Sequence, residues 1–250
     1  MTQLTILTGA SRGMGFAMAE QLCTSKHTLL CISRGSSDVL EALAKKNGTT
    51  LTQWQADLAQ PEAVANKLMA WLQTQEGSTF SQASLINNAG VIGHLGPIEQ
   101  ATASSVQQAL AINLAAPMLL TQVFLQATRA WPAKRKVLQI SSGLGRRAMA
   151  ASAVYCATKA GLDHFSRSAA LDEALLANPA HIVSLAPGVI DTDMQTDLRS
   201  GNPTGFPDQA NFIQLKKSGS LTSPAEAAAR VLGFLARGDF GSNAVADVRD

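Results

Sequence analysis

The sequence predicts a single α/β domain built on a parallel, doubly wound sheet of seven strands with helices on both faces. Short apolar runs alternate with longer helical segments along the whole chain. The runs are apolar throughout rather than at every second residue, which is typical of strands buried on both faces. No repeat, low-complexity tract or linker divides the 250 residues, and α/β chains of this length commonly form one domain.

The elements follow in regular order. The candidate strands span residues 4–8, 28–33, 50–55, 84–87, 136–141, 181–186 and 244–248. The candidate helices lie near residues 13–25, 37–46, 61–75, 102–129, 152–177 and 223–236. Pro61 and Pro224 each follow a polar residue and suit the first turn of a helix. Strands joined through helices imply right-handed crossovers, and therefore a parallel sheet.

One long segment has no clear period. Between residues 195 and 220 the chain carries Gly201, Pro203, Gly205 and Pro207. In a compact domain a long irregular segment is a lid, a binding loop or a disordered stretch. We therefore predict a substrate loop at about 192–220.

Composition and charge exclude several classes of protein. The chain is 46% hydrophobic and 15% charged, with a net charge of +2, which makes no case for nucleic-acid or membrane binding. No run of 18 apolar residues and no signal peptide is present. Cys23, Cys31 and Cys156 lack metal-type spacing and suit a reduced, cytoplasmic interior. The scattered histidines predict no metal site. They are His27, His94, His164 and His181.

A glycine-rich turn follows the first strand and opens the first helix. It reads Thr-Gly-Ala-Ser-Arg-Gly-Met-Gly over residues 8–15. Its glycines allow a tight turn and a close approach to a ligand. The helix N-terminus that follows offers free N–H groups and a positive dipole end to a pyrophosphate. A turn of this composition can also occur without a ligand, but its position favours dinucleotide binding.

Charge at the end of the second strand favours NADP over NAD. NAD sites usually place an acid there, whereas this strand ends in Ser33 and Arg34. Arg12 lies within the glycine turn, and two guanidiniums favour a 2′-phosphate. Arg34 could instead be a solvated loop residue. Asp57 and Leu58 follow the third strand and could meet the adenine, although Asp57 could equally cap a helix.

Four polar residues are candidates for a catalytic site. Tyr155 is the one tyrosine of the chain, and Lys159 lies four residues later on the same face of a helix. A nearby cation favours the phenolate and lowers a tyrosine pKa from about 10. Ser142 follows the strand at 136–141, at the edge where ligands bind such sheets. Asn113 lies in an apolar helix, where a buried amide needs partners. Each residue alone also has an ordinary structural explanation.

Together these motifs resemble the short-chain dehydrogenases/reductases. The resemblance rests on residues 8–15, Asn-Asn-Ala-Gly at 87–90, Asn113, Ser142, Tyr-Cys-Ala-Thr-Lys at 155–159 and Pro-Gly-Val-Ile-Asp-Thr at 187–192. It covers essentially the whole chain and implies a Rossmann-type fold. Within the family the chain looks most similar to the sepiapterin reductase and benzil reductase group. The segments that carry this are 140–143, 154–156, 186–188, 191–195 and 215–221.

The resemblance also implies roles for the catalytic residues. Tyr155 would protonate the carbonyl oxygen as hydride arrives, and Ser142 would hydrogen-bond that oxygen. Lys159 would lower the tyrosine pKa and bind the nicotinamide ribose. Asn113 would hold a water of the proton relay through its helix backbone.

The predicted contacts of the cofactor and the substrate follow from the same motifs. The cofactor-binding residues are Gly9, Ser11, Arg12, Gly13, Met14, Gly15, Ser33, Arg34, Asp57, Leu58, Asn88, Ala89, Gly90, Tyr155, Lys159, Ile190, Thr192 and Met194. The substrate-binding residues are Ser142, Gly143, Tyr155, Gly188 and Asp247. Asp247 is similar in position to the aspartate that anchors the pterin in sepiapterin reductases, but it could be an exposed acid at a strand end.

The expected activity is therefore the NADPH-dependent reduction of a ketone, a vicinal diketone or a pterin side chain. A non-catalytic NADP(H)-binding redox sensor on the same fold is the alternative. The resemblance also implies a homodimer or homotetramer that pairs the helices at 102–129 and 152–177 across a two-fold axis. The sequence does not name the substrate.

Overall fold

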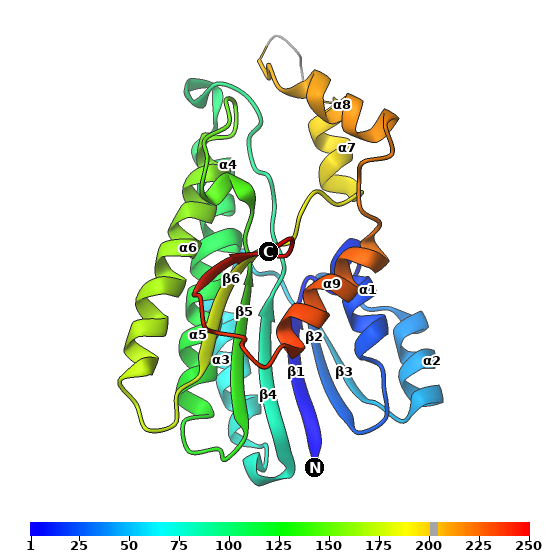
Figure 1. Cartoon of the computed structure of the whole chain (residues 1–250), viewed down its shortest axis with the longest axis vertical. Helices are drawn as coiled ribbons and strands as arrows, with labels where there is room; N and C mark the ends of the chain where they lie inside the picture. The colour runs from blue at the N-terminus through cyan, green and yellow to red at the C-terminus, as the bar shows by residue number, and fades with distance from the viewer. Residues whose placement is uncertain (201–204) are drawn as a thin grey trace.

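Seven parallel strands form one twisted sheet in the order β3-β2-β1-β4-β5-β6-β7 (Figure 1). The computed structural model describes residues 1–200 and 205–250. The strands are β1 (Thr2–Thr8), β2 (His27–Ser33), β3 (Thr50–Gln55), β4 (Phe80–Asn87), β5 (Lys134–Ile140), β6 (His181–Ala186) and β7 (Val245–Asp247). The predicted fold class is confirmed, and the strand order reverses between β1 and β4, where doubly wound sheets bind ligands.

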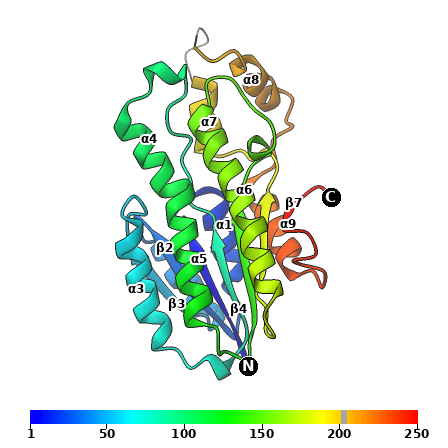
Figure 2. The ribbon, with the colours of Figure 1, turned by 90° about the vertical axis from the view of Figure 1, so that its left-hand side faces the viewer.

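Helices cover both faces of the sheet (Figures 1 and 2). One face packs against α3 (Pro61–Gln73), α5 (Ala116–Ala127) and α6 (Ala153–Ala174). The other face packs against α1 (Gly13–Leu22), α2 (Asp38–Asn47) and α9 (Pro224–Ala236). Three short 3-10 turns are also present among the described residues. They are η1 (Gly77–Thr79), η2 (Ile98–Gln100) and η4 (Gly143–Gly145).

The apolar strands divide their side chains between two cores. In β2, Leu30 and Ile32 enter the core under α3 and α5, whereas Leu29 and Cys31 enter the core under α1 and α9. Successive side chains of a strand point to opposite faces, so a strand covered on both sides must be apolar at every position. This double burial is why the strands read as continuous apolar runs.

The long helix expected at 102–129 is interrupted. It consists of α4 (Ala103–Leu110), a π-helical turn η3 (Ala111–Ala115) and α5. The π-turn adds a residue to the helix, as occurs often at functional sites, and it contains Asn113. Among the described residues, the stretch Ala103–Ala127 is long and apolar enough to cross a membrane by length and composition alone. Half of its most apolar window is buried inside the domain, as in a core helix.

The segment predicted as a substrate loop at 192–220 is largely helical. It forms α7 (Asp193–Ser200) and α8 (Gln209–Lys217), which stand beyond the carboxyl ends of the strands (Figure 1). The prediction of an irregular loop is wrong for these residues. Their few apolar side chains pack with Met149 and Leu144 in a small cluster, in which Phe206 stacks on Phe212, so they carry little periodic signal. Gly201 and Pro203 lie outside the described residues.

Candidate active site

A single cleft at the carboxyl ends of the strands brings the predicted site together. Its cavity volume is about 480 Å³, within the range of small-molecule sites. Every predicted cofactor-binding and substrate-binding residue lines it, and so do three of the four predicted catalytic residues. Asn113 does not line the cleft. Residues separated by more than 200 positions in the chain therefore share one surface.

The glycine turn has the backbone that the sequence predicts. Gly9 and Gly13 have φ values of +72° and +55°, which side chains rarely allow. A Cβ on Gly15 would lie 2.0 Å from the carbonyl oxygen of Gly9, so helix α1 can begin against the turn only with glycine there. The hydroxyl of Ser33 accepts from the backbone N–H of Ala10 at 2.7 Å and fixes the turn to β2.

Gly15→Ala should destabilise the domain, because its methyl group would collide with backbone rather than with a flexible side chain. Overpacking costs about 1–3 kcal/mol, and we expect at least that loss in the free energy of unfolding. Urea unfolding checks it. Gly35→Ala is the matched control, because a Cβ there meets nothing within 4 Å. Equal stability of the two variants would contradict the tight contact at Gly15.

The strand β4 is tied to the same turn. The hydroxyl of Thr8 accepts from the backbone N–H groups of Asn88 and Ala89 at 2.9 and 3.0 Å. The Asn88 side-chain amide donates to the carbonyl oxygens of Thr8 and Gly9 at 3.0 and 3.2 Å. The predicted cofactor residue Asn88 thus shapes the cleft through its side chain by holding the turn in place.

Arg12 and Arg34, the two cations predicted to bind the cofactor, differ in their contacts. Arg12 donates to Asp193 at the start of α7 at 2.9 Å, and both side chains are exposed. Arg34 is exposed and makes no ion pair or side-chain hydrogen bond within the described residues. Asp57 accepts from the backbone N–H of Ala59 at 2.9 Å, so it stabilises the turn that precedes α3 while lining the cleft.

Tyr155, Lys159 and Ser142 meet at the centre of the cleft. Tyr155 and Lys159 lie one turn apart on α6, and their exposed fractions are 6% and 4%. The Lys159 ammonium donates to the carbonyl oxygen of Ile140 at the end of β5 at 2.7 Å. It lies 5.7 Å from the centroid of the Tyr155 ring. Ser142 follows β5, and its hydroxyl accepts from the backbone N–H of Leu144 at 3.2 Å.

The pKa of Tyr155 differs from the expected direction. Burial raises it to about 12, although a hydrogen bond with Ser142 lowers it in part. The hydrogen bond of the Lys159 ammonium goes to the carbonyl oxygen of Ile140 rather than to Tyr155. Burial lowers the pKa of Lys159 to about 8, and the nearby Asp163 opposes this. The expectation that the lysine lowers the tyrosine pKa is therefore not met in this structure.

Asn113 supports the cleft from behind. Its side-chain oxygen accepts from the backbone N–H of Val91 at 2.8 Å, and its nitrogen donates to the Val91 carbonyl at 2.8 Å. It also donates to the hydroxyl of Thr158 at 3.3 Å. The fully buried amide thereby joins the segment after β4 to the helix that carries Tyr155.

Comparison with known proteins identifies the family. The family model described as short chain dehydrogenase matches residues 3–203. The chain belongs to the short chain dehydrogenase family. It is therefore an oxidoreductase with a site for a nicotinamide cofactor.

Individual relatives support this assignment. The chain is 34% identical over 235 residues to a Bacillus cereus protein named benzil reductase ((S)-benzoin forming), and the match covers 94% of each. It is 30% identical over 256 residues to the sepiapterin reductase of Mus musculus, covering 98% of this chain and 96% of the relative. The solved structure of the KRED1-Pglu enzyme is similar with a TM-score of 0.80 at 27% identity, covering 97% of this chain and 99% of the other.

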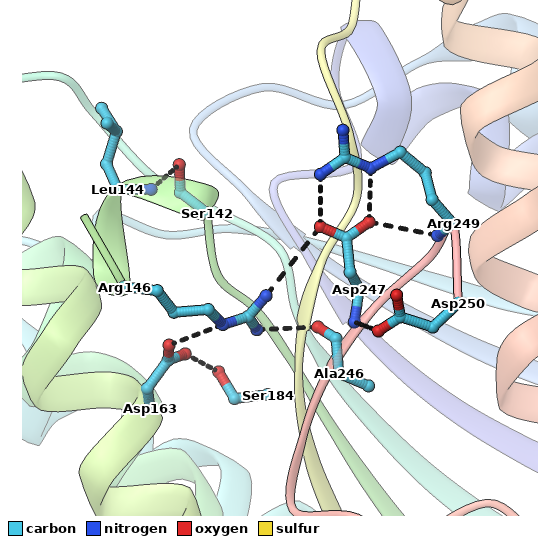
Figure 3. Close-up of polar contacts among 9 residues, drawn as sticks. All are labelled: Ser142, Leu144, Arg146, Asp163, Ser184, Ala246, Asp247, Arg249 and Asp250. Carbon is cyan, nitrogen blue, oxygen red and sulfur yellow. Dashed lines mark hydrogen bonds and ion pairs between the residues drawn. The ribbon is translucent and has the colours of Figure 1, made fainter.

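In this short chain dehydrogenase a network of arginines and carboxylates surrounds Asp247, which lines the cleft (Figure 3). Arg146 lies 3.4 Å from the buried carboxylate of Asp163 on α6 and donates to the Ala246 carbonyl at 2.7 Å. Asp247 is bound by both Nε and Nη2 of Arg249 at 2.7 Å. The network fastens the turn after Ser142 and the last strand to the helix of Tyr155 and Lys159 (Figure 3).

Several lining residues were not predicted from the sequence. The structure adds Arg147 and Arg249 as cations and a group of apolar side chains. The apolar group comprises Val91, Ile92, Leu144, Val189, Leu198 and Phe212. The sequence analysis selected Asp247, although Arg249 lies only two residues later and could have been selected by its position as well. Within residues 1–200 and 205–250, no group of three or more His, Cys, Asp or Glu could hold a metal ion.

Proposed function

We propose that this short chain dehydrogenase is an NADPH-dependent carbonyl reductase that acts on a ketone or vicinal diketone, with Tyr155 as the proton donor. The observation that carries the proposal is the position of Tyr155, Ser142 and Lys159 in the same cleft as the glycine turn. The similarity to proteins named benzil reductase and sepiapterin reductase supports reduction of a carbonyl group.

The cleft fits a dinucleotide with a 2′-phosphate. Gly9 and Gly15 let the turn pack closely against the start of α1, and a helix N-terminus in this position can bind a pyrophosphate. No acid follows β2 at the position that binds a ribose hydroxyl in NAD enzymes, and Arg34 is available there. The exposed pair of Arg12 and Asp193 is worth little in water, so a phosphate can displace the carboxylate. When bound, the cofactor supplies the hydride.

The protein groups around the carbonyl supply the proton and its orientation. With a pKa raised to about 12, Tyr155 keeps its proton at neutral pH and can donate it as negative charge develops on the substrate oxygen. The Ser142 hydroxyl lies beside it and can donate to the same oxygen. The Lys159 ammonium places a positive charge under the reacting groups while it is protonated.

Arg34→Ala should weaken NADPH binding about tenfold or more, because a hydrogen bond to a charged group contributes about 1.5–3 kcal/mol. NADH carries no 2′-phosphate, so its affinity should change little. Fluorescence titration with both cofactors checks this prediction. Arg230→Ala, at an exposed arginine on α9 outside the cleft, is the control. Equal losses for NADPH and NADH would show that Arg34 has a structural role instead.

We also propose that the protein is a cytoplasmic homo-oligomer that uses no membrane or nucleic-acid partner. Leu171 on α6 and Leu175, which follows its last residue, are 71% and 86% exposed. Leu110 on α4 and Met118 on α5 are exposed as well. Such apolar side chains suit a self-complementary interface across a two-fold axis. Light scattering at micromolar concentration should give the mass of a dimer or tetramer. A monomer mass would refute the proposal.

A further inference from the structure

The carboxylate of Asp247 already accepts three hydrogen bonds from Arg249. A carboxylate offers about four acceptor sites. In Asp247 one oxygen accepts from the backbone N–H of Arg249 at 3.1 Å and from its Nε at 2.7 Å. The other oxygen accepts from Nη2 of Arg249 at 2.7 Å and faces Arg146 at 3.9 Å. These contacts hold the pKa of Asp247 below its usual value, so it stays ionised and paired.

The group that remains able to bind a substrate is the guanidinium of Arg249. A guanidinium has five N–H donors, and Asp247 takes two of them. The others are directed away from the carboxylate in Figure 3 and belong to a side chain that lines the cleft. Arg147, which has no side-chain partner among the described residues, lines the same cleft. Two arginines with free donors, Arg147 and Arg249, therefore line the cleft beside the paired carboxylate of Asp247.

We propose that Arg249, oriented by Asp247, binds an acceptor group of the substrate that lies next to the reacting carbonyl. A carboxylate or a second carbonyl oxygen can accept hydrogen bonds from the guanidinium. An amine that donates to a carboxylate would not bind there. The inference rests on the proposed carbonyl reductase activity and names its substrate class as an oxo acid or vicinal dicarbonyl. Asp247 is then a positioning residue rather than the anchor of a substrate amine.

The bond to Arg249 is made to a substrate group other than the reacting carbonyl, so it should act mainly on substrate binding. An interaction made equally in the ground state and transition state changes KM and leaves kcat near its original value. A structural defect would instead lower the amount of active protein and reduce kcat for every substrate. A change in KM alone would therefore indicate lost substrate binding, and a lower kcat for every substrate would indicate a structural defect.

The experiment compares phenylglyoxylate, its methyl ester and acetophenone in the NADPH-dependent assay, with wild-type enzyme and Arg249→Met. The three ketones share a phenyl group and differ in the neighbouring acceptor. Loss of a hydrogen bond to a charged group should raise the KM of phenylglyoxylate about tenfold or more. The KM of acetophenone, which has no second acceptor, should stay within about twofold. Arg249→Lys keeps the charge and should restore part of the affinity for phenylglyoxylate.

Arg230→Met, outside the cleft, should leave all three KM values unchanged. An unchanged KM for phenylglyoxylate in Arg249→Met would overturn the inference, and the carbonyl reductase proposal would stand. A preference for sepiapterin that Asp247→Asn removes would also overturn it in favour of an amine anchor. Failure of the wild-type enzyme to reduce any ketone with NADPH would instead refute the proposed function.

Discussion

Tyr155→Phe should lower the rate of ketone reduction about 10²–10⁴-fold, the usual contribution of general acid catalysis. The change removes one oxygen and keeps the ring, which is buried against the cleft wall, so the protein should still fold. NADPH should still bind, because the glycine turn and Arg34 lie at the other end of the cleft. The loss should therefore appear in kcat rather than in cofactor affinity.

Rates at saturating NADPH and a cofactor titration together test this prediction. Cys156→Ala is the control, because Cys156 is the neighbouring residue on α6 and does not line the cleft. It should keep close to the wild-type rate. A Tyr155→Phe protein that binds NADPH and reduces a diketone at the wild-type rate would exclude Tyr155 as the proton donor.

Lys159→Met should also reduce the rate strongly and should change its dependence on pH. The active form needs a protonated Tyr155, with a pKa of about 12, and a charged Lys159, with a pKa of about 8. The wild-type rate should thus be level below pH 8 and fall as pH rises through about 8, where the ammonium loses its proton. In the variant that fall should disappear, and any remaining loss of rate should occur at higher pH.

A pH–rate profile of kcat at saturating cofactor measures the effect. Lys136→Met provides the control, because Lys136 is also a buried lysine whose pKa is lowered by burial, but it donates to the Leu235 carbonyl outside the cleft. It should keep the decline near pH 8. A decline near pH 8 that survives in Lys159→Met would assign that titration to another group.

The sheet was predictable because burial on both faces makes strands such as β1 and β2 largely apolar. β2 and β6 were located to within a residue, as expected for strands that enter both cores. α7 and α8 were not predictable, because their stability comes from a small cluster around Phe206 rather than from an apolar stripe that faces the sheet. The π-turn at Asn113 was not predicted, because the apolar pattern of the sequence continues through it without interruption.

The residues of the cleft were predictable because they belong to compact motifs of fixed order. Their electrostatics were not, since these depend on contacts between distant parts of the chain. Arg12 pairs with Asp193, which lies 181 positions away. Burial, which depends on the packing of the whole cleft, raises the pKa of Tyr155 to about 12. The hydrogen bond from Arg146 to the Ala246 carbonyl likewise joins residues that lie 100 positions apart.

The most direct test of the central proposal follows the hydride itself. NADPH that carries deuterium at its transferable position is incubated with the protein and a vicinal diketone, and the product is examined by mass spectrometry. The account predicts deuterium on the new alcohol carbon, formed by the wild-type protein and greatly slowed in Tyr155→Phe. Tight binding of NADPH without deuterium transfer to any ketone would contradict the account and favour a non-catalytic redox sensor.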